Sequence, residues 1–404
     1  MNELPGVPAN ADQVSLAGRI RELATLFFKL GTISFGGPAA HIALIEGEVV
    51  GKRHWVSKQQ FLDMLGAANL IPGPTSTQMA INVGYARAGW VGLCVAGAAF
   101  IFPAALITAA FAWAYVRFGN LPQAGWVLAG IKPAVLAVIA IAIGRLGKTA
   151  VRDAGLAVLG GLSLAAFFVG LNPIAILLGC GLLGMLGRRV VHWRATAAGL
   201  CSPALRWSRS PRGIAAVLLS ASAVETAAVR PSLARIALFF LKLGAVLYGG
   251  GYVLLAFLEQ GLVRQRGWLT QPQLLDAVAI GQFTPGPVLS TATFIGYILG
   301  GIPGAAVATV GIFLPSFFYV ALLAPVLFRL RQSAWMTAFL DSVNVCAVAL
   351  MAGATVRLGV DALPTWGAGA IALAALALLL RWKISPAWIV LGGGIAGLLL
   401  AATR

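Results

Sequence analysis

The chain carries the same unit twice. Residues 26–46 read LFFKLGTISFGGPAAHIALIE, and residues 239–259 read FFLKLGAVLYGGGYVLLAFLE, at a constant offset of 213 positions. The offset also pairs Lys29 with Lys242, Glu46 with Glu259, Arg53 with Arg266, Asp63 with Asp276, and Pro72-Gly73-Pro74 with Pro285-Gly286-Pro287. Apolar sequence of low complexity aligns by chance, but ionisable residues and prolines in one order do not. The chain is therefore an internal duplication.

Composition decides which kind of duplicated fold this is. Hydrophobic residues make up 59% of the chain and charged residues 10%, whereas a soluble domain has ~25% charged residues. We therefore predict an all-α polytopic membrane protein of two homologous halves.

Eight of the 29 Lys and Arg residues lie between Arg188 and Arg235, beside a single acid, Glu225. Such basic stretches are typical of cytoplasmic loops, so the net charge of +17 is not interpreted as nucleic-acid binding.

These features predict three parts. An N-terminal repeat covers 1–188 and a C-terminal repeat covers 236–404. An Arg-rich cytoplasmic linker, 189–235, joins them and contains an apolar stretch at 213–229 that is either an extra span or a surface helix.

Loop charges indicate that the two repeats are inverted in the membrane. In the first half the loop near Arg145 and Lys148 is basic, and the next loop, 169–172, has no basic residue. In the second half, the loop equivalent to 169–172 carries two basic residues, Arg381 and Lys383. A basic loop that changes sides between homologous halves is expected when the halves have opposite orientations.

Each half begins with interrupted apolar stretches. Segments 22–34 and 58–70 are roughly 20 Å long as helices at ~1.5 Å per residue, shorter than a ~30 Å hydrocarbon core. They run into GGP and PGP motifs, where glycine permits a bend and proline suits the first turn of a new helix. We therefore expect broken or re-entrant half-helices in both halves at these motifs. Such breaks are tolerated at membrane depth where protein or a water-filled cavity satisfies the backbone. Simple kinking of transmembrane helices is the alternative.

A helix N-terminus presents free N–H donors and attracts anions, so the new helices are candidate substrate sites. Hydroxyl groups that follow the PGP turns could replace the hydration of a tetrahedral oxyanion. The candidate motif and hydroxyl residues are Gly36, Gly37, Pro38, Pro72, Gly73, Pro74, Thr75, Ser76 and Thr77 in the first half, and Gly249, Gly250, Pro285, Gly286, Pro287, Ser290 and Thr291 in the second.

Ionisable residues inside the apolar segments complete the candidate site, because each costs at least ~2.5–3.5 kcal/mol at mid-membrane. Lys29 and Lys242 are the simplest counter-charges for an anionic substrate. Glu46 and Glu259 could pair with these lysines, gate the path or carry a proton, and Asp63 and Asp276 could do likewise. Snorkelling or structural ion pairing is the alternative for all six residues.

The sequence shows no Ser-His-Asp, HExxH or Walker-type pattern, which argues against a hydrolase and against direct coupling to ATP. The four cysteines and three histidines are scattered, so we expect no metal site and no cofactor. The oligomeric state is left open, a homodimer included.

Two motifs carry a resemblance to a known family. The chain resembles the chromate ion transporter family over nearly its whole length. The resemblance rests on Phe35-Gly36-Gly37-Pro38, the Lys-Leu-Gly that precedes it, the glutamate that follows it, and the two PGP turns. The second half departs from the pattern as Tyr248-Gly249-Gly250-Gly251, without the proline. The resemblance implies a long-chain, two-domain protein that exports chromate across the bacterial inner membrane, confers chromate resistance, and meets sulfate as a competing anion.

Physical chemistry makes export the less demanding direction. An inside-negative potential is worth about 2.3 kcal/mol per charge per 100 mV, hence roughly 4.6 kcal/mol for a dianion that leaves the cell. At about 1.4 kcal/mol per tenfold, that sustains a gradient of roughly a thousandfold. Proton-coupled import of sulfate or another oxyanion is the alternative, with Glu46 and Glu259 as coupling carboxylates. A membrane-bound chromate reductase would need a redox centre that the sequence does not signal.

Overall fold

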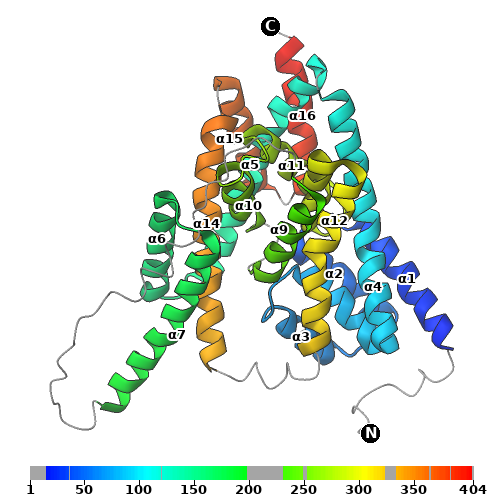
Figure 1. Cartoon of the computed structure of the whole chain (residues 1–404), viewed down its shortest axis with the longest axis vertical. Helices are drawn as coiled ribbons and strands as arrows, with labels where there is room; N and C mark the ends of the chain where they lie inside the picture. Colours follow the sequence, from blue (N-terminus) through cyan, green and yellow to red (C-terminus); the bar gives the residue numbers. More distant parts are fainter. Residues whose placement is uncertain are drawn as a thin grey trace.

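A computed structural model describes residues 15–35, 37–119, 121–197, 231–248, 253–323, 334–363, 365–382 and 384–402. Gly36, Gly249, Gly250 and the apolar stretch 213–229 lie outside the described residues. Figure 1 shows an all-helical bundle, and no strand occurs in the part of the chain that the structure describes.

Helices of the first half follow the segments expected from the sequence. They are α1 (Leu16–Ile33), α2 (Pro38–Glu46), the π-helix η2 (Gly47–Lys52), α3 (Lys58–Ala68), α4 (Thr75–Phe118), α5 (Pro122–Ala150), α6 (Ala154–Val169) and α7 (Pro173–Ala197). The last of them, α7, continues into the Arg-rich stretch that begins at residue 189.

The second half repeats this order. Its helices are α9 (Leu233–Val246), α10 (Leu254–Leu258), the π-helix η3 (Glu259–Arg264), α11 (Gln271–Phe283), the short 3-10 helix η4 (Val288–Ser290), α12 (Thr291–Leu323), α14 (Ala334–Ala362), α15 (Trp366–Arg381) and α16 (Pro386–Ala402). The π-helices are a detail that hydrophobic periodicity does not predict. They lie at the repeated glutamate: η2 begins directly after Glu46, and η3 begins at Glu259.

Matching kinks divide the two longest helices. In α4 the backbone leaves the helical region at Ala88 and Gly89, where Gly89 has φ 60° and ψ −145°. In α12 the same break falls at Gly300 and Gly301, where Gly301 has φ 63° and ψ −152°. The positive φ is accessible to glycine at little cost, so the repeat conserves a bend as well as a sequence.

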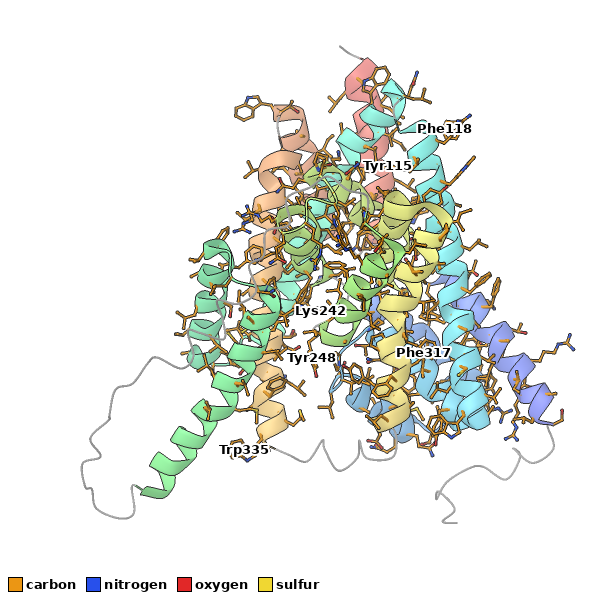
Figure 2. All side chains as sticks on the ribbon, in the orientation of Figure 1. Tyr115, Phe118, Lys242, Tyr248, Phe317 and Trp335 are labelled. Atoms are coloured by element: carbon orange, nitrogen blue, oxygen red, sulfur yellow. The ribbon has the colours of Figure 1, made fainter. Side chains whose placement is uncertain are left out.

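Equivalent helices run in opposite directions. Phe118, at the end of α4, lies near the top of Figure 2, whereas Phe317, towards the end of α12, lies in the lower half. Trp335, at the start of α14, lies at the bottom of the same view. The expectation of two homologous halves in inverted orientation, with helices broken at the GGP and PGP motifs, is confirmed.

The halves are intertwined rather than side by side. Within each half the first helix packs on the long kinked helix, α1 on α4 and α9 on α12, and the two kinked helices pack on each other. Helices α15 and α16 of the second half, however, pack on α5 of the first, while α6 and α7 of the first half pack on α14 of the second. Each repeat therefore completes its packing with helices of the other.

Four of the described helices are long and apolar enough to cross a membrane. They are Thr75–Phe118, Gln123–Ala150, Val288–Leu322 and Trp335–Val360. The described shorter apolar helices include Ala154–Val169 and Trp366–Arg381. Many apolar side chains on the outer surface are exposed, which in water would be a large hydrophobic patch and in a bilayer is a lipid-facing surface. The chain is a multi-pass membrane protein.

Candidate substrate site

Each PGP turn binds the end of the first helix of the other half. The backbone N–H of Gly73 donates to the carbonyl oxygen of Leu247, directly after α9, at 2.7 Å. The N–H of Gly286 donates to the carbonyl oxygen of Ser34, directly after α1, at 2.8 Å. Ser34 and Leu247 are themselves repeat partners, so one contact is made twice with the halves exchanged. We call this pair of turns the PGP crossing.

Both glycines of the PGP crossing are required by conformation and by space. Gly73 has φ +124° and Gly286 has φ +88°, values that other L-residues adopt at a cost of roughly 1–2 kcal/mol. A Cβ atom on Gly73 would lie 2.5 Å from Oγ of Ser316 on α12, and one on Gly286 would lie 2.6 Å from Cβ of Ala104 on α4. A larger residue at either turn would therefore force a neighbouring atom to move.

The prolines and glycines of the motifs begin new helices. Gly37, with φ 84°, precedes Pro38, the first residue of α2. Pro74 directly precedes the first residue of α4, and Pro287 directly precedes η4. The N–H groups of a helix's first turn have no intrahelical acceptor, so two helix starts with free donors adjoin the PGP crossing.

Buried hydroxyl groups gather around these helix starts. Ser76, Thr77, Ser290 and Thr291 are buried, and Thr75 is half-buried. Four hydroxyl oxygens near the PGP crossing are buried without a hydrogen-bond partner among the described residues: those of Ser34, Thr77, Ser290 and Ser316. Buried polar groups in native proteins are nearly always satisfied, so these hydroxyls are available to a bound polar species.

The two lysines lie near the PGP crossing but outside it. Lys29 and Lys242 each precede by five residues the carbonyl that accepts the hydrogen bond from the opposite PGP turn, about 7.5 Å along the helix axis. Both side chains are exposed on the protein surface. Lys29 acts electrostatically on Glu48 of η2, whereas Lys242, near the centre of the view in Figure 2, lines a cavity.

The repeated glutamates have different surroundings in the two halves. Glu46 is half-buried, whereas Glu259 is fully buried and forms ion pairs with Arg264 at 2.8 Å and Arg357 at 3.6 Å. Arg357 also donates hydrogen bonds to the carbonyl oxygens that end α6, at 3.0 and 3.2 Å. Glu259 is thus part of a network that joins α14 to η3 and α6.

Sequence reasoning missed the partner of Asp276. This buried carboxylate forms an ion pair with Lys132 on α5 at 3.2 Å and accepts a hydrogen bond from the hydroxyl of Tyr115 on α4 at 3.0 Å. The contact joins the two halves inside the bundle. Its signal in the sequence is a lysine in the middle of the apolar run 123–146. Asn344 occupies the repeat-equivalent position of Lys132, so the second half has no copy of this pair.

Asp63, the counterpart of Asp276, has a different environment. It is half-buried and accepts a hydrogen bond from Gln59 on its own helix at 3.2 Å. The duplication therefore preserved the carboxylate at this position but placed it in two different environments, one half-buried and one buried.

An inverted repeat with broken helices that meet between the halves, buried hydroxyl groups and intramembrane ion pairs is the architecture of a secondary membrane transporter. The chain belongs to the chromate transporter family, whose model matches residues 21–185 and again residues 234–398.

Individual relatives agree with this membership. The chain is 34% identical to a chromate transport protein of Cupriavidus metallidurans over 94% of this chain and 92% of the relative. It is 33% identical to a probable chromate transport protein of Synechococcus elongatus over 90% of both chains. It is 31% identical to a chromate transport protein of Pseudomonas aeruginosa over 94% of this chain and 92% of the relative. No solved structure matches the chain significantly.

Proposed function

We propose that this protein exports chromate from the bacterial cytoplasm across the inner membrane and thereby confers chromate resistance. Two relatives are named chromate transport proteins and a third a probable one, which favours chromate as the substrate, and the inverted halves supply a means of alternating access. The observation that carries the proposal is the PGP crossing, where each half holds the other next to unsatisfied buried hydroxyls.

In this proposal the dianion binds between the halves. Hydroxyls and N–H groups of the helix starts at Pro38, Pro74 and Pro287 replace part of its hydration, and Lys29 and Lys242 supply the opposing charge. Rocking of one repeat, 1–188, against the other, 236–404, then opens the site to each side in turn. The linker 189–235 lies in the cytoplasm.

The membrane potential is the proposed driving force. Export of a dianion down an inside-negative potential of 100 mV releases roughly 4.6 kcal/mol, so neither ATP nor protons are required. The buried carboxylate Glu259 is engaged with two arginines, which supports a structural role for it in place of proton transfer.

The decisive measurement is uptake of radioactive chromate into inverted membrane vesicles with and without an imposed inside-positive potential. We expect accumulation that depends on the potential and falls when excess sulfate competes. Accumulation of sulfate alone would change the substrate, and acidification that accompanies transport would indicate proton coupling. Movement of neither anion by folded protein would contradict the proposal.

Replacing the repeated lysines tests the cationic part of the site. Lys242→Gln is expected to lower the initial rate of chromate uptake about tenfold, the equivalent of ~1.4 kcal/mol, and Lys29→Gln together with it to lower the rate further. Lys58→Gln, an exposed lysine at the start of α3, is the control and is expected to transport normally. Normal transport by the double variant at equal protein levels would exclude both lysines from the site.

A further inference from the structure

Three small polar side chains meet where the two halves exchange helices. Ser163 of α6, Cys180 of α7 and Cys346 of α14 have exposed fractions of 1%, 9% and 0%. The hydroxyl oxygen of Ser163 lies 3.2 Å from Sγ of Cys180 and 3.0 Å from Sγ of Cys346, and the two thiols are hydrogen-bonded to each other. We call this group the Cys-Ser-Cys cluster. Its two cysteines come from different halves of the chain.

Helices α7 and α14 approach each other closely around this cluster. A Cβ atom on Gly181 of α7 would lie 2.9 Å from Cγ2 of Val343, and one on Gly184 would lie 2.6 Å from Cβ of Ser342. Small residues allow helices to come together in this way in a membrane. A disulfide requires Cα atoms about 4.4–6.8 Å apart, so only such a close crossing brings cysteines of two helices within reach of each other.

The repeat provides a second copy of this crossing, and there it is apolar. The repeat pairs Cys346 with Ala134 of α5, Ser163 with Ala375 of α15, and Cys180 with Gly393 of α16. Ala134 and Ala375 belong to one apolar cluster, and a Cβ atom on Gly393 would lie 2.7 Å from Cβ of Ala134. Alanine and glycine therefore satisfy the packing at this crossing. Packing alone does not explain why the other copy carries two adjoining thiols.

Burial restricts which oxidants can reach the cluster. A charged reagent would lose its hydration on entering an apolar bundle, at a large cost in free energy. Hydrogen peroxide is small and uncharged, so it avoids this cost. Cys180 is the more exposed of the two cysteines and is the one that it meets first.

We propose that Cys180 and Cys346 are a redox-sensitive crosslink between the halves, which hydrogen peroxide closes to a disulfide and a dithiol reductant reopens. The sulfur of Cys180 attacks one peroxide oxygen, the O–O bond breaks, and the departing hydroxide leaves as water with the thiol proton. The sulfur of Cys346 then attacks that of Cys180, the S–O bond breaks, and a second water takes the proton of Cys346. Two thiols lose two electrons, and one peroxide becomes two waters.

The closed crosslink would hold the halves in one arrangement. It would tie α7 of the first half to α14 of the second by a covalent bond. This consequence rests on the proposed function, in which one repeat rocks against the other. Transport therefore stops while the disulfide is closed, although no proposed substrate-binding residue has changed.

The test uses the full-length protein with Cys94→Ser and Cys201→Ser, which retains only the two clustered cysteines. The purified protein is treated with hydrogen peroxide, denatured and alkylated with N-ethylmaleimide, so that its intact mass counts the remaining thiols. Mass spectrometry of an unreduced digest identifies joined peptides. Cys346→Ser in the same background is the matched control, because it keeps Cys180 and Ser163 but cannot form the crosslink.

Chromate uptake into inverted vesicles is measured before peroxide, after peroxide and after dithiothreitol. We expect peroxide to remove both thiols, to join the peptides of Cys180 and Cys346, and to abolish potential-driven uptake until dithiothreitol restores it. The Cys346→Ser control should continue to transport after peroxide.

Two free thiols after treatment, or oxidised cysteines whose peptides are not joined, would overturn the crosslink. Unchanged uptake with the disulfide closed, or an equal loss of uptake in the Cys346→Ser control, would overturn its effect on transport. If the untreated protein moves neither chromate nor sulfate, the proposed function fails, whereas the joined peptides still decide whether the crosslink forms.

Discussion

Lys132→Met is expected to destabilise the protein by about 3–5 kcal/mol, because it leaves the carboxylate of Asp276 buried without its positive partner. The side chain of Asp276 is only 3% exposed and that of Lys132 is 20% exposed, so water replaces little of the lost ion pair. Tyr115 still donates one hydrogen bond, which is too little to offset a buried charge. Thermal unfolding of the detergent-solubilised protein should show a midpoint lower by about 5 °C or more.

A double variant separates the ion pair from simple loss of packing. Lys132→Met combined with Asp276→Leu removes both charges, and we expect it to recover most of the lost stability, because apolar replacements of a buried pair are often neutral. Asp63→Asn, at the repeat-equivalent position, is the matched control and should lower the midpoint by less than Asp276→Asn does, because Asp63 is half-buried whereas Asp276 is buried. A Lys132→Met protein as stable as the wild type, or a double variant no better than the single one, would contradict this account.

Gly73→Ala and Gly286→Ala are expected to lower chromate transport at least tenfold each. The added Cβ faces a penalty of roughly 1–2 kcal/mol for the positive φ and about 1–3 kcal/mol for overpacking against Ser316 or Ala104. Relief of either strain would move a PGP turn away from the helix end of the other half. Since that hydrogen bond joins the two halves at the proposed site, its displacement should act on transport more strongly than on expression.

Uptake into inverted vesicles at equal protein levels measures this effect. Gly51→Ala is the control, because a Cβ there would meet no atom within 4 Å and Gly51 does not have a positive φ. It should transport like the wild type. Normal transport by both PGP variants would show that the PGP crossing tolerates a side chain and does not position the substrate site.

These predictions depend on sequence and tertiary structure to different degrees. The duplication, the membrane class, the inverted orientation and the helix breaks were all predictable, because each follows from local chemistry. Gly37 takes a positive φ and Pro38 starts a helix whatever lies around them, and apolar runs form helices in lipid because their backbone groups have no other partner. Loop charges carry the orientation for an equally local reason.

Only the tertiary structure decided which residues meet. Gly73 lies 174 positions from Leu247, and Lys132 lies 144 positions from Asp276, so no local pattern links either pair. The repeat predicts equal roles for Glu46 and Glu259, but the structure gives them different surroundings: Glu46 is half-buried and Glu259 is fully buried. The exchange of helices is itself symmetric, since α6 and α7 pack on α14 as α15 and α16 pack on α5. Substitutions between equivalent positions, such as Glu48 against Gly261 and Lys132 against Asn344, make the charges of the two halves asymmetric. The tertiary structure then decides which distant residues these charges meet, as it does for Lys132 and Asp276.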